Sequence, residues 1–324
     1  MAQEKILYLS RSDVEASGPA MTDIILALET MFMEKAAGRT EMPPKPGIHT
    51  RPDTFIHAMP AYIPAIGAAG MKWVSSYPSN RRRGLPNISG LIVLNDPETG
   101  LPQAVMDCSW ITAKRTGAAT AVAAKRLARR EAHTAGILGC GVQGRSNLEA
   151  LRAVFHLTRI VAYDNDPDAL AGFAAEAADD SGIEIIAARA PEEAVRGAEI
   201  VVTAGPIVKT PHATIRPGWL QPGAFASLVD YDSYWDRRAL AEVDKFCTDD
   251  IAQMEFAKSM GFFKEIPPIH AELCDLVSGR RPGRENDTER TMACNLGLAL
   301  DDMATAPLVL RRAKEMGLGT WLPL

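Results

Sequence analysis

The apolar and polar positions of this chain follow two different rhythms. After about residue 134, short apolar runs alternate with longer segments in which apolar residues recur every three or four positions. Strands that alternate with helices at this spacing predict βαβ units and a parallel sheet. The apolar runs are AGILGCG (135–141), RIVAYD (159–164), IEIIAA (183–188), AEIVVTAG (198–205) and GAFASLVD (223–230), and the helical patterns are DPDALAGFAAEAADD (166–180) and APEEAVRGA (190–198).

The first 125 residues have a different texture. A helical pattern at 23–38 is followed by proline-rich, β-type segments at 42–64 and 68–80. In the stretch 88–107, residues 96–100 (DPETG) have the composition of a turn between two strands. This part therefore predicts an antiparallel or mixed sheet with helices on one side.

Two further segments are predicted to be helical. The alanine-rich stretch 109–130 indicates a connecting helix with Thr112 as a candidate N-cap. The stretch 288–319 indicates a long helix or a helix pair, with a possible break before Pro307. Its terminal position leaves open which domain it packs on.

Three glycines follow the first apolar run of the parallel part. Gly139, Gly141 and Gly144 fit the pattern G-x-G-x-x-G, with a predicted strand before them and a predicted helix from near Gln143. The first glycine allows a tight turn, the second lets backbone amides approach a phosphate, and the third permits close packing of helix on strand. The helix N-terminus then directs its positive end at the pyrophosphate. The motif in this context predicts a dinucleotide site.

An acidic residue supports the same interpretation. Asp164 ends the second apolar run, 20 residues after Gly144, where a carboxylate can accept hydrogen bonds from the adenosine ribose. The alternative is that Asp164 caps the helix that follows. A carboxylate here repels a 2′-phosphate, and the segment DNDPD that begins at Asp164 contains no arginine. NAD is therefore favoured over NADP.

Composition and charge exclude several classes of protein. A net charge of −5 and a pI of about 5.8 argue against nucleic acid or an anionic membrane as a partner. No apolar run is long enough to span a bilayer, and the stretch MAQEKILYLSR lacks the features of a signal peptide. Five scattered cysteines without a C-x-x-C pair, and six histidines without H-x-x-x-H spacing, favour a cytoplasmic protein without a metal site.

Candidate chemistry comes from residues on both sides of the glycine motif. Lys72 lies in the apolar setting GMKWV, where a buried ammonium needs a partner such as a substrate carboxylate; otherwise it is a lysine that reaches the surface. Arg115 can grip a carboxylate with two hydrogen bonds, or form a surface salt bridge. Asp230 and Asp232 follow an apolar run, so we expect them at the carboxyl edge of the parallel sheet, where either can exchange a proton with substrate.

At this point the chain resembles the ornithine cyclodeaminase/μ-crystallin family over nearly its full length. The resemblance is carried by the long string from Met71 to Lys125, MKWVSSYPSNRRRGLPNISGLIVLNDPETGLPQAVMDCSWITAKRTGAATAVAAK, by GILGCGVQG (136–144) and by LGLALDDMATAPLVLRRAKEMGLG (296–319). The middle string is far more specific than the glycine motif.

The resemblance implies an α/β protein in which a Rossmann domain is inserted into an α+β substrate-binding and dimerisation domain. It places the substrate and dimerisation domain at 1–125, the Rossmann domain at 126–295, and a C-terminal helix that returns to the first domain at 296–324. It also implies a homodimer that binds NAD or NADP and acts on small α-amino or α-imino acids. Members of the family include cyclodeaminases, alanine dehydrogenases, reductases of ketimines and imino acids, and a crystallin that binds thyroid hormone.

The resemblance also assigns roles to individual positions. Lys72 matches an active-site lysine near the substrate carboxylate, Arg115 an arginine that binds substrate and lies near the cofactor, and Asp232 the catalytic aspartate. Asp230 falls where small residues are usual. The positions that match cofactor-binding residues are Asn87, which replaces a threonine, together with Gly139, Gly141, Val142, Gln143, Gly144 and Asp164.

Two departures from the family bear on the substrate. Lys45 stands where cyclodeaminases have an arginine that holds the carboxylate, which keeps the charge but loses the planar fork. His57 stands where they have a glutamate that contacts the substrate amine, so a distal ammonium loses its partner. His57 either helps Lys45, Lys72 and Arg115 to form a cationic substrate pocket or is an ordinary histidine on a strand.

Three functions follow as alternatives. The first is an NAD(P)H-dependent imino-acid reductase, equivalent to an amino-acid dehydrogenase, for which the cationic groups suggest a dicarboxylic substrate such as iminosuccinate. The second is a cyclodeaminase of ornithine or lysine that recycles NAD internally. The third is a non-catalytic protein that binds the dinucleotide, against which the presence of Lys72, Arg115 and Asp232 speaks.

Overall fold

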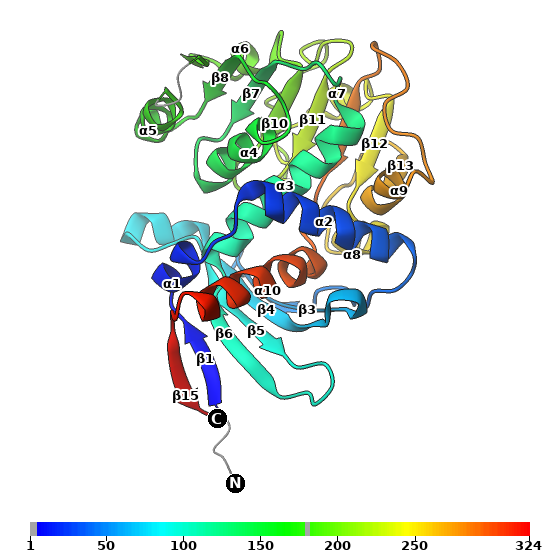
Figure 1. Ribbon diagram of the computed structural model, residues 1–324. Coiled ribbons are helices and arrows are strands. Elements are labelled where there is room, and N and C mark those ends of the chain that lie inside the picture. The colour runs from blue at the N-terminus through cyan, green and yellow to red at the C-terminus, as the bar shows by residue number, and fades with distance from the viewer. Residues whose placement is uncertain (1–4, 179–181) are drawn as a thin grey trace. The chain divides into compact units, whose positions relative to one another are not determined.

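A computed structural model, shown in Figure 1, describes residues 5–178 and 182–324. The start of the N-terminal stretch and the last two residues of the predicted helical pattern 166–180 thus lie outside the described residues. The chain divides into two compact units, Met1–Arg115 with Leu298–Leu324, and Thr116–Gly297. The second unit is inserted into the first. The two breaks lie ten residues before and two residues after the boundaries expected from the sequence, at 125 and 295.

Unit 1 contains a seven-stranded mixed sheet. Strand β1 pairs in parallel with β6, and every other neighbouring pair is antiparallel. This confirms the mixed sheet predicted for the first part of the chain. In spatial order the strands are β15 (Thr320–Pro323), β1 (Lys5–Leu9), β6 (Pro102–Asp107), β5 (Ile88–Asn95), β4 (Ala68–Ser76), β3 (Phe55–Ile63) and β2 (Gly47–Ile48).

The predicted turn at 96–100 joins β5 to β6. Asp96 accepts hydrogen bonds at Oδ1 from the amides of Glu98 (2.8 Å) and Thr99 (3.1 Å), and Gly100 takes a positive φ of 74°. An aspartate at the start and a glycine at the end are typical of such turns. The aspartate side chain accepts hydrogen bonds from backbone amides of the turn, and glycine adopts a positive φ without steric cost. The hairpin is therefore confirmed in type and position.

Helices cover one face of this sheet. They are α1 (Arg11–Ala16), α2 (Met21–Ala36) and α10 (Ala299–Glu315), with short 3₁₀ helices at Pro64–Ile66 and Pro78–Arg83. Helix α10 contacts α2, β3, β4 and β5, as Figure 1 shows. Strand β4 alternates accordingly, because Lys72, Val74 and Ser76 are buried on this face, whereas Trp73 on the other face is exposed.

Three local expectations are wrong. Helix α3 (Ser109–Leu127) begins three residues before Thr112, which lies inside it. Pro307 lies within α10 and does not end it, because one proline removes a single backbone hydrogen bond from a helix that is buried along much of its length. Residues 291–294 form a strand, since a short apolar run cannot be told from a buried helical segment by periodicity alone.

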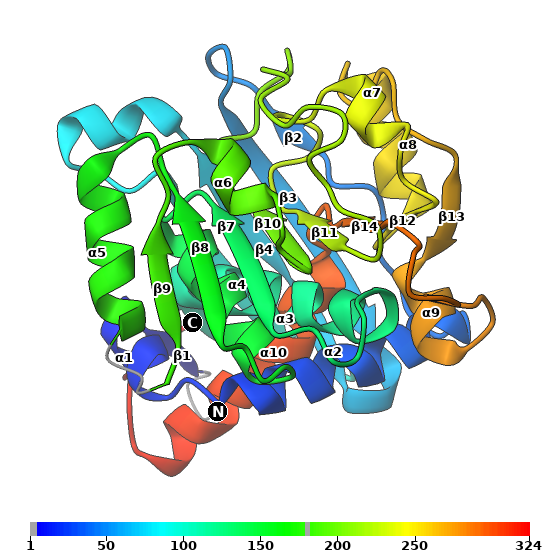
Figure 2. The ribbon, with the colours of Figure 1, turned by 90° about the horizontal axis from the view of Figure 1, so that it is seen from above.

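Unit 2 is built on eight parallel strands. Figure 2 shows them side by side, and the order reverses at β7, which lies between β8 and β10. Such a reversal is where α/β sheets bind ligands, outside the carboxyl ends of the strands. In spatial order the strands are β13 (Ile269–Glu272), β12 (Lys245–Thr248), β14 (Thr291–Cys294), β11 (Phe225–Leu228), β10 (Ile200–Thr203), β7 (Thr134–Leu138), β8 (Arg159–Tyr163) and β9 (Glu184–Ala187).

The predicted βαβ order is confirmed. Strands β10, β11, β12 and β14 are buried throughout, and β7 is buried except at its first residue, as expected for a sheet that is covered on both faces. Trp235 and Phe246 are among the largest buried side chains of the core. The helices are α4 (Val142–Arg152), α5 (Pro167–Ala178), α6 (Pro191–Val195), α7 (Arg237–Leu240), α8 (Ile251–Ser259) and α9 (Leu273–Ser278).

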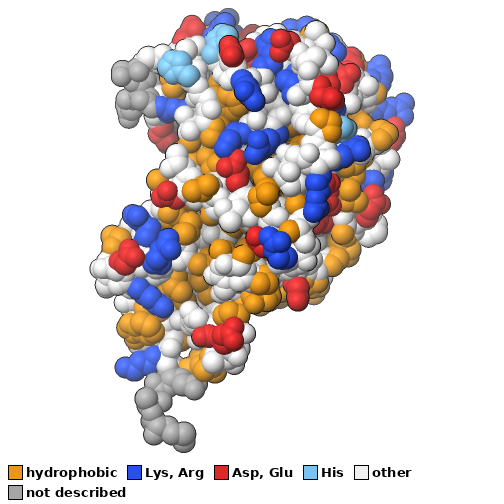
Figure 3. Space-filling view, turned by 45° about the vertical axis from the view of Figure 1, so that its right-hand side comes forward, with side chains coloured by type: hydrophobic (Ala, Val, Ile, Leu, Met, Phe, Trp, Pro, Cys, Tyr) orange, Lys and Arg blue, Asp and Glu red, His pale blue; other side chains and the backbone are white. Residues whose placement is uncertain are grey.

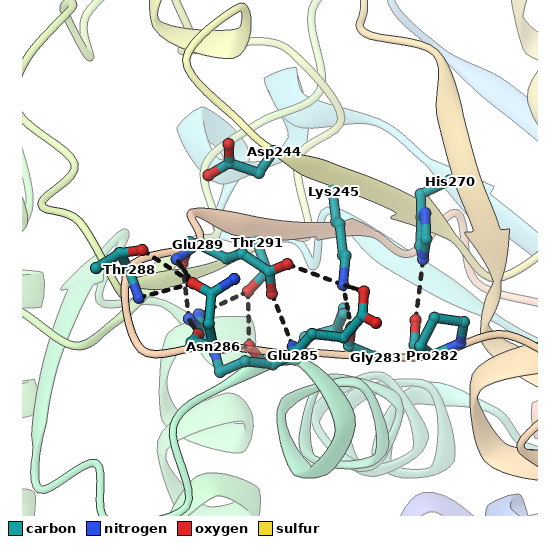
Figure 4. A network of polar contacts seen from close by, with 12 residues as sticks. Asp244, Lys245, His270, Pro282, Gly283, Glu285, Asn286, Thr288, Glu289 and Thr291 are labelled. Atoms are coloured by element: carbon teal, nitrogen blue, oxygen red, sulfur yellow. Dashed lines mark hydrogen bonds and ion pairs between the residues drawn. The ribbon is translucent and has the colours of Figure 1, made fainter.

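Structural contacts occupy the amino edge of this sheet. Figure 4 shows Lys245, the first residue of β12, where its Nζ bonds the carbonyl of Gly283 and the carboxylate of Glu285, each at 2.6 Å. Glu289 lies 3.0 Å from the same Nζ. These contacts hold the loop before β14. The candidate site residues of unit 2 lie at the opposite, carboxyl edge of the sheet.

The surface carries both signs of charge. On the face drawn in Figure 3, basic, acidic and apolar side chains are intermixed. Among the described residues, no helix is both long enough and apolar enough to cross a membrane.

Candidate active site

The glycine motif forms a tight turn between β7 and α4. Gly139 has a φ of 99°, and its amide donates to the carbonyl of Tyr163 at 2.9 Å. A Cβ at Gly144 would collide with the carbonyl oxygen of Gly139, so the third glycine is required by packing alone. Gly141 is the N-cap of α4, and a Cβ there would meet nothing within 4 Å. The second glycine therefore leaves open space above the helix N-terminus.

The residues around this space fit a phosphate group. Val142 at the first turn of α4 is 67% exposed, although it is apolar. Within the described part of the chain, no group donates a hydrogen bond to the buried Oε1 of Gln143. A helix N-terminus with open space and an exposed first turn suits a phosphate group, whereas the orphaned acceptor can take a hydrogen bond only from a donor such as a ribose hydroxyl.

Asp164 joins the glycine loop to the end of β8. Its Oδ2 accepts from the amide of Cys140 at 2.7 Å, and its Oδ1 accepts from the amide of Asp166 at 2.9 Å. The cap of α5 is provided by Asp166, whose Oδ1 accepts from the amides of Asp168 and Ala169. Asp164 is therefore held beside the loop and does not serve as the helix cap, which was the alternative considered from the sequence.

In unit 1, two buried cations share one carboxylate. Lys72 is 1% exposed, and its Nζ lies 2.6 Å from Oδ2 of Asp302. The Nε of Arg115 lies 3.3 Å from Oδ1 of the same aspartate, and its guanidinium also reaches Asp301 at 3.4 Å. Both cations are thus buried, as argued from the sequence for Lys72, and in this structure α10 supplies the charged partners.

Sequence reasoning missed Asp301 and Asp302. Both are 0% exposed, in the first turn of α10, and Asp301 also accepts from the amide of Leu298 at 2.9 Å. The signal was present in LALDDMATA (298–306), where two acids stand in an apolar setting. The argument that a buried Lys72 needs a partner applies equally to them.

Burial and Arg115 lower the pKa of Lys72, and Asp302 opposes both effects. Removal from water disfavours the ammonium, and the neighbouring guanidinium repels it, whereas the carboxylate at 2.6 Å attracts it. Thr112, at 3.4 Å, is a further contact of Nζ. Asp302 is therefore the group that keeps this ammonium charged.

His57 lies on the same face of the sheet as Lys72. Its ring stacks on Phe55 with centroids 4.1 Å apart, and it occupies the register position opposite Val74. Burial, followed by the charges of Lys45, His49 and Lys72, lowers the pKa of His57 to about 3. The imidazole is thus neutral at neutral pH and adds no positive charge to the site.

The remaining predicted residue of unit 1 is Asn87. It precedes β5, and its Oδ1 accepts from the hydroxyl of Ser76 at 3.3 Å, while its carbonyl accepts from the amide of Tyr77 at 2.8 Å. These contacts fix the end of β4 to the start of β5.

Two aspartates follow β11 at the carboxyl edge of unit 2, as expected. Asp232 is 6% exposed; burial raises its pKa, and the amide of Phe263 opposes that shift. Burial also raises the pKa of Asp230, to about 7, although Thr203 and the amide of Gly205 donate to it. Tyr231 between them has a φ of 63°, in the left-handed region.

Some of the predicted residues form a cluster in each unit, whereas Asn87 bonds Ser76 and Tyr77, and Asp232 lies in the turn after β11. In unit 1, Lys72, Arg115, His57 and Lys45 lie within electrostatic reach of at least one other member. In unit 2, the glycine loop and Asp164 are hydrogen-bonded together. Among the residues that the structure describes, no three acidic, histidine or cysteine side chains are placed to hold a metal ion, and all five cysteines are free and buried.

Comparison with known proteins identifies the family. Residues 4–317 match the model of the ornithine cyclodeaminase/mu-crystallin family. The chain belongs to this family. A curated relative is the alanine dehydrogenase of Archaeoglobus fulgidus, which is 34% identical over 97% of this chain and 97% of that protein.

Solved structures of the family have the same fold. The Δ1-pyrroline-2-carboxylate reductase of Thermococcus litoralis, in complex with NADH and L-proline, gives a TM-score of 0.88 at 35% identity and covers 97% of this chain and 99% of its own. An archaeal alanine dehydrogenase dimer with bound NAD gives 0.87 at 33% identity, with 98% and 99% covered. These likenesses confirm the family resemblance and the inserted Rossmann domain.

Two glycine substitutions separate packing from ligand approach. Gly144→Ala forces the carbonyl of Gly139 to move, so we expect it to lower both the free energy of unfolding and the affinity for NADH. Gly141→Ala has room and an extended backbone (φ −78°, ψ −160°), so its stability should stay within about 0.5 kcal/mol of the parent while NADH affinity falls at least about tenfold. Urea unfolding and NADH titration measure the two effects. Unchanged affinity in Gly141→Ala contradicts a phosphate site at this loop.

A double-mutant cycle tests the shared carboxylate. Asp302→Asn leaves Lys72 and Arg115 without that counter-charge, so we expect a loss of about 3–5 kcal/mol in the free energy of unfolding. Lys72→Met with Asp302→Asn removes the stranded ammonium as well, and should be more stable than Asp302→Asn alone. Equilibrium denaturation of the four proteins gives the coupling. Strictly additive effects would show that the pair is not formed.

Proposed function

We propose that this protein is an NAD-dependent oxidoreductase that reduces a small α-imino acid to the L-amino acid, or runs the reverse reaction as an amino-acid dehydrogenase. The observation that carries the proposal is the buried pair of cations Lys72 and Arg115, which the carboxylate of Asp302 already bridges and which a substrate carboxylate would share with it. The family relatives named as an alanine dehydrogenase and a pyrroline-2-carboxylate reductase support the reaction class.

The residues of unit 2 hold the cofactor. The glycine loop with Val142 and Gln143 binds the pyrophosphate, and Asp164 binds the adenosine ribose, which favours NAD over NADP because its carboxylate repels a 2′-phosphate. Asn87 and Arg115 are the further cofactor contacts that the family resemblance implies. When bound, the reduced cofactor supplies a hydride to the α-carbon of the substrate.

The protein's own groups position the substrate and move the proton. Lys72 and Arg115 fix the carboxylate, with Lys45 assisting, so that the α-carbon has one orientation. Asp232 donates a proton to the nitrogen that becomes an amine and accepts it in the reverse direction. Its raised pKa suits this exchange, because burial stabilises the protonated form that must donate.

The charges of unit 1 favour a substrate with one carboxylate. Lys72 and Arg115 are balanced by Asp301 and Asp302, and His57 is neutral. Lys45 is a further cation, whose charge acts on His57. The case for a dicarboxylic substrate rested on an excess of cations, so we propose a small monocarboxylic α-imino acid in place of iminosuccinate.

Cyclodeamination of ornithine or lysine is the second candidate. A neutral imidazole at position 57 supplies no fixed negative charge for a distal ammonium, which places this reaction behind reduction. A non-catalytic binding role comes third, because it gives no use to the buried carboxylate site. Location in the cytoplasm remains a prediction, supported by five free, buried cysteines.

The substrate assay distinguishes these candidates. We expect NADH oxidation with small 2-oxo acids plus ammonia, or with cyclic imino acids, and a kcat/KM at least about tenfold higher for monocarboxylic than for dicarboxylic substrates. Lys72→Met should lower kcat/KM by at least about a hundredfold and leave NADH affinity unchanged. Release of ammonia from ornithine without net change in NADH selects cyclodeamination, and cofactor binding without turnover of any such substrate selects a binding protein.

We further propose that the protein is a homodimer formed through the open face of the unit 1 sheet. This face, opposite Lys72, carries Trp73 (44% exposed) and Leu91 (41%) directly opposite each other on the neighbouring strands β4 and β5, and Tyr8 (39%) on β1, which β6 separates from β5. Exposed apolar side chains that form a continuous patch mark an interaction surface. The archaeal alanine dehydrogenase described as a dimer supports a second copy as the occupant.

Light scattering after gel filtration tests the dimer. We expect a mass of twice 35.0 kDa for the parent protein and 35.0 kDa for Trp73→Asp. Met316→Asp, which changes an exposed apolar residue just after α10, serves as the control and should stay dimeric. A monomeric parent, or a dimeric Trp73→Asp, rejects this face as the interface.

A further inference from the structure

Asp230 is a buried carboxyl group that the proposed reaction does not use. It is 0% exposed, and its two oxygens accept from the hydroxyl of Thr203 at 2.6 Å and the amide of Gly205 at 2.9 Å. Thr203 ends β10, and Asp230 follows β11, so this carboxyl ties together the carboxyl ends of two neighbouring strands. Removing a carboxyl group from water at this position costs free energy, and the path of the chain here does not itself require an acidic residue.

The bond to Gly205 connects Asp230 to the glycine loop. A Cβ at Gly139 would lie 2.6 Å from the carbonyl oxygen of Ala204 and 3.1 Å from the amide nitrogen of Gly205. The same amide donates to Asp230. One peptide group therefore lies between the first turn of the dinucleotide loop and this carboxyl.

Asp230 is also the first residue of the turn that carries Asp232. Tyr231 takes a left-handed backbone conformation, which a bulky residue adopts only when its surroundings impose it. The turn is completed by the amide of Ser233, which donates to the carbonyl of Asp230 at 3.3 Å, and by Ser233 Oγ, which accepts from the amide of Val208 at 3.0 Å. Asp230 thus lies between the cofactor loop and the proposed proton donor.

The ionisable groups around Asp230 are acidic. Asp232 acts on it directly, and the phenol of Tyr234 responds to the charges of both Asp230 and Asp164. The thiol of Cys294, at the end of β14, responds to Asp249, Asp232 and Asp230. Of these carboxyl groups, Asp232 acts on Asp230 itself, where it disfavours an additional negative charge and favours an approaching positive one.

We propose that Asp230 senses the redox state of the bound nicotinamide: its ionised form favours the oxidised, positively charged ring, and its protonated form favours the reduced, neutral ring. The inference rests on the proposed binding of NAD, since ligands of such sheets lie outside the carboxyl ends of the strands at the switch point, here β7 and its neighbour β10, and Asp230 bonds to Thr203 at the end of β10. Binding of the oxidised cofactor then releases a proton from Asp230, and binding of the reduced cofactor does not.

The direction of the pH dependence follows from this linkage. Asp230 has a pKa of about 7, so raising the pH through neutrality ionises it. The affinity for NAD⁺ should rise over that range, and the affinity for NADH should not. We expect the ratio Kd(NADH)/Kd(NAD⁺) of the intact protein, measured without substrate, to increase about three- to tenfold between about pH 6 and pH 8.

Asp230→Asn tests the group itself. Asparagine can accept from Gly205 and donate to Thr203, so it imitates the protonated carboxyl and should abolish the change in the ratio with pH. Asp236→Asn is the matched control, because it removes a carboxylate from the same segment but keeps the cap of α7, and should behave as the parent. Calorimetry in buffers of different ionisation enthalpy should detect proton release on binding of NAD⁺ to the parent only.

A second variant covers a failure of Asp230→Asn to fold. Thr203→Val removes a donor that lowers the pKa of Asp230, so the transition in the ratio should move to higher pH. A ratio that is flat in the parent, or that changes equally in Asp230→Asn, overturns the inference while leaving the proposed function intact. If neither cofactor binds, the proposed function fails, and this inference fails with it.

Discussion

The carboxylate of Asp302 is the constraint on which unit 1 depends. Two cations on different elements, β4 and α3, are buried with one acidic side chain of α10 between them, and Asp301 is a second partner of Arg115. Without it, the cost of removing an ammonium and a guanidinium from water would oppose the packing of α10 on the sheet. The carboxylate of Asp302 bridges the two cations, and the proposed function uses this same spacing to bind a substrate carboxylate.

In unit 2, ion pairs and hydrogen-bonded carboxyl groups lie at opposite edges of the sheet. At the amino edge of its sheet, Lys245 and its glutamates form ion pairs that fix a loop. At the carboxyl edge, Asp164 and Asp230 are buried or half-buried against backbone amides and a hydroxyl. Hydrogen bonds from amides hold a carboxyl group in one orientation and favour its ionised form. A charged ligand nearby therefore still interacts with these carboxyl groups. The two edges of one sheet therefore serve stability and chemistry separately.

The features predicted correctly from the sequence are those that depend on residues close together along the chain. The glycine spacing, the aspartate after the next strand and the alternation of strands and helices all follow from neighbours within about 20 to 30 residues, and they are confirmed. The partners of Lys72 and Arg115 did not follow, because Arg115 and Asp301 are 186 residues apart. The strand at 291–294 and the continuation of α10 through Pro307 also depend on burial by distant elements.

The charge of the substrate site illustrates the same limit. A count of lysine, arginine and histidine near the site indicates a strongly cationic pocket, yet burial decides which of these groups carry charge. His57 loses its proton because it is buried beside other cations, and the acids of α10 cancel two charges that remain. Residue identity therefore sets the available chemistry, whereas the net charge of these side chains is set by how the fold pairs and dehydrates them.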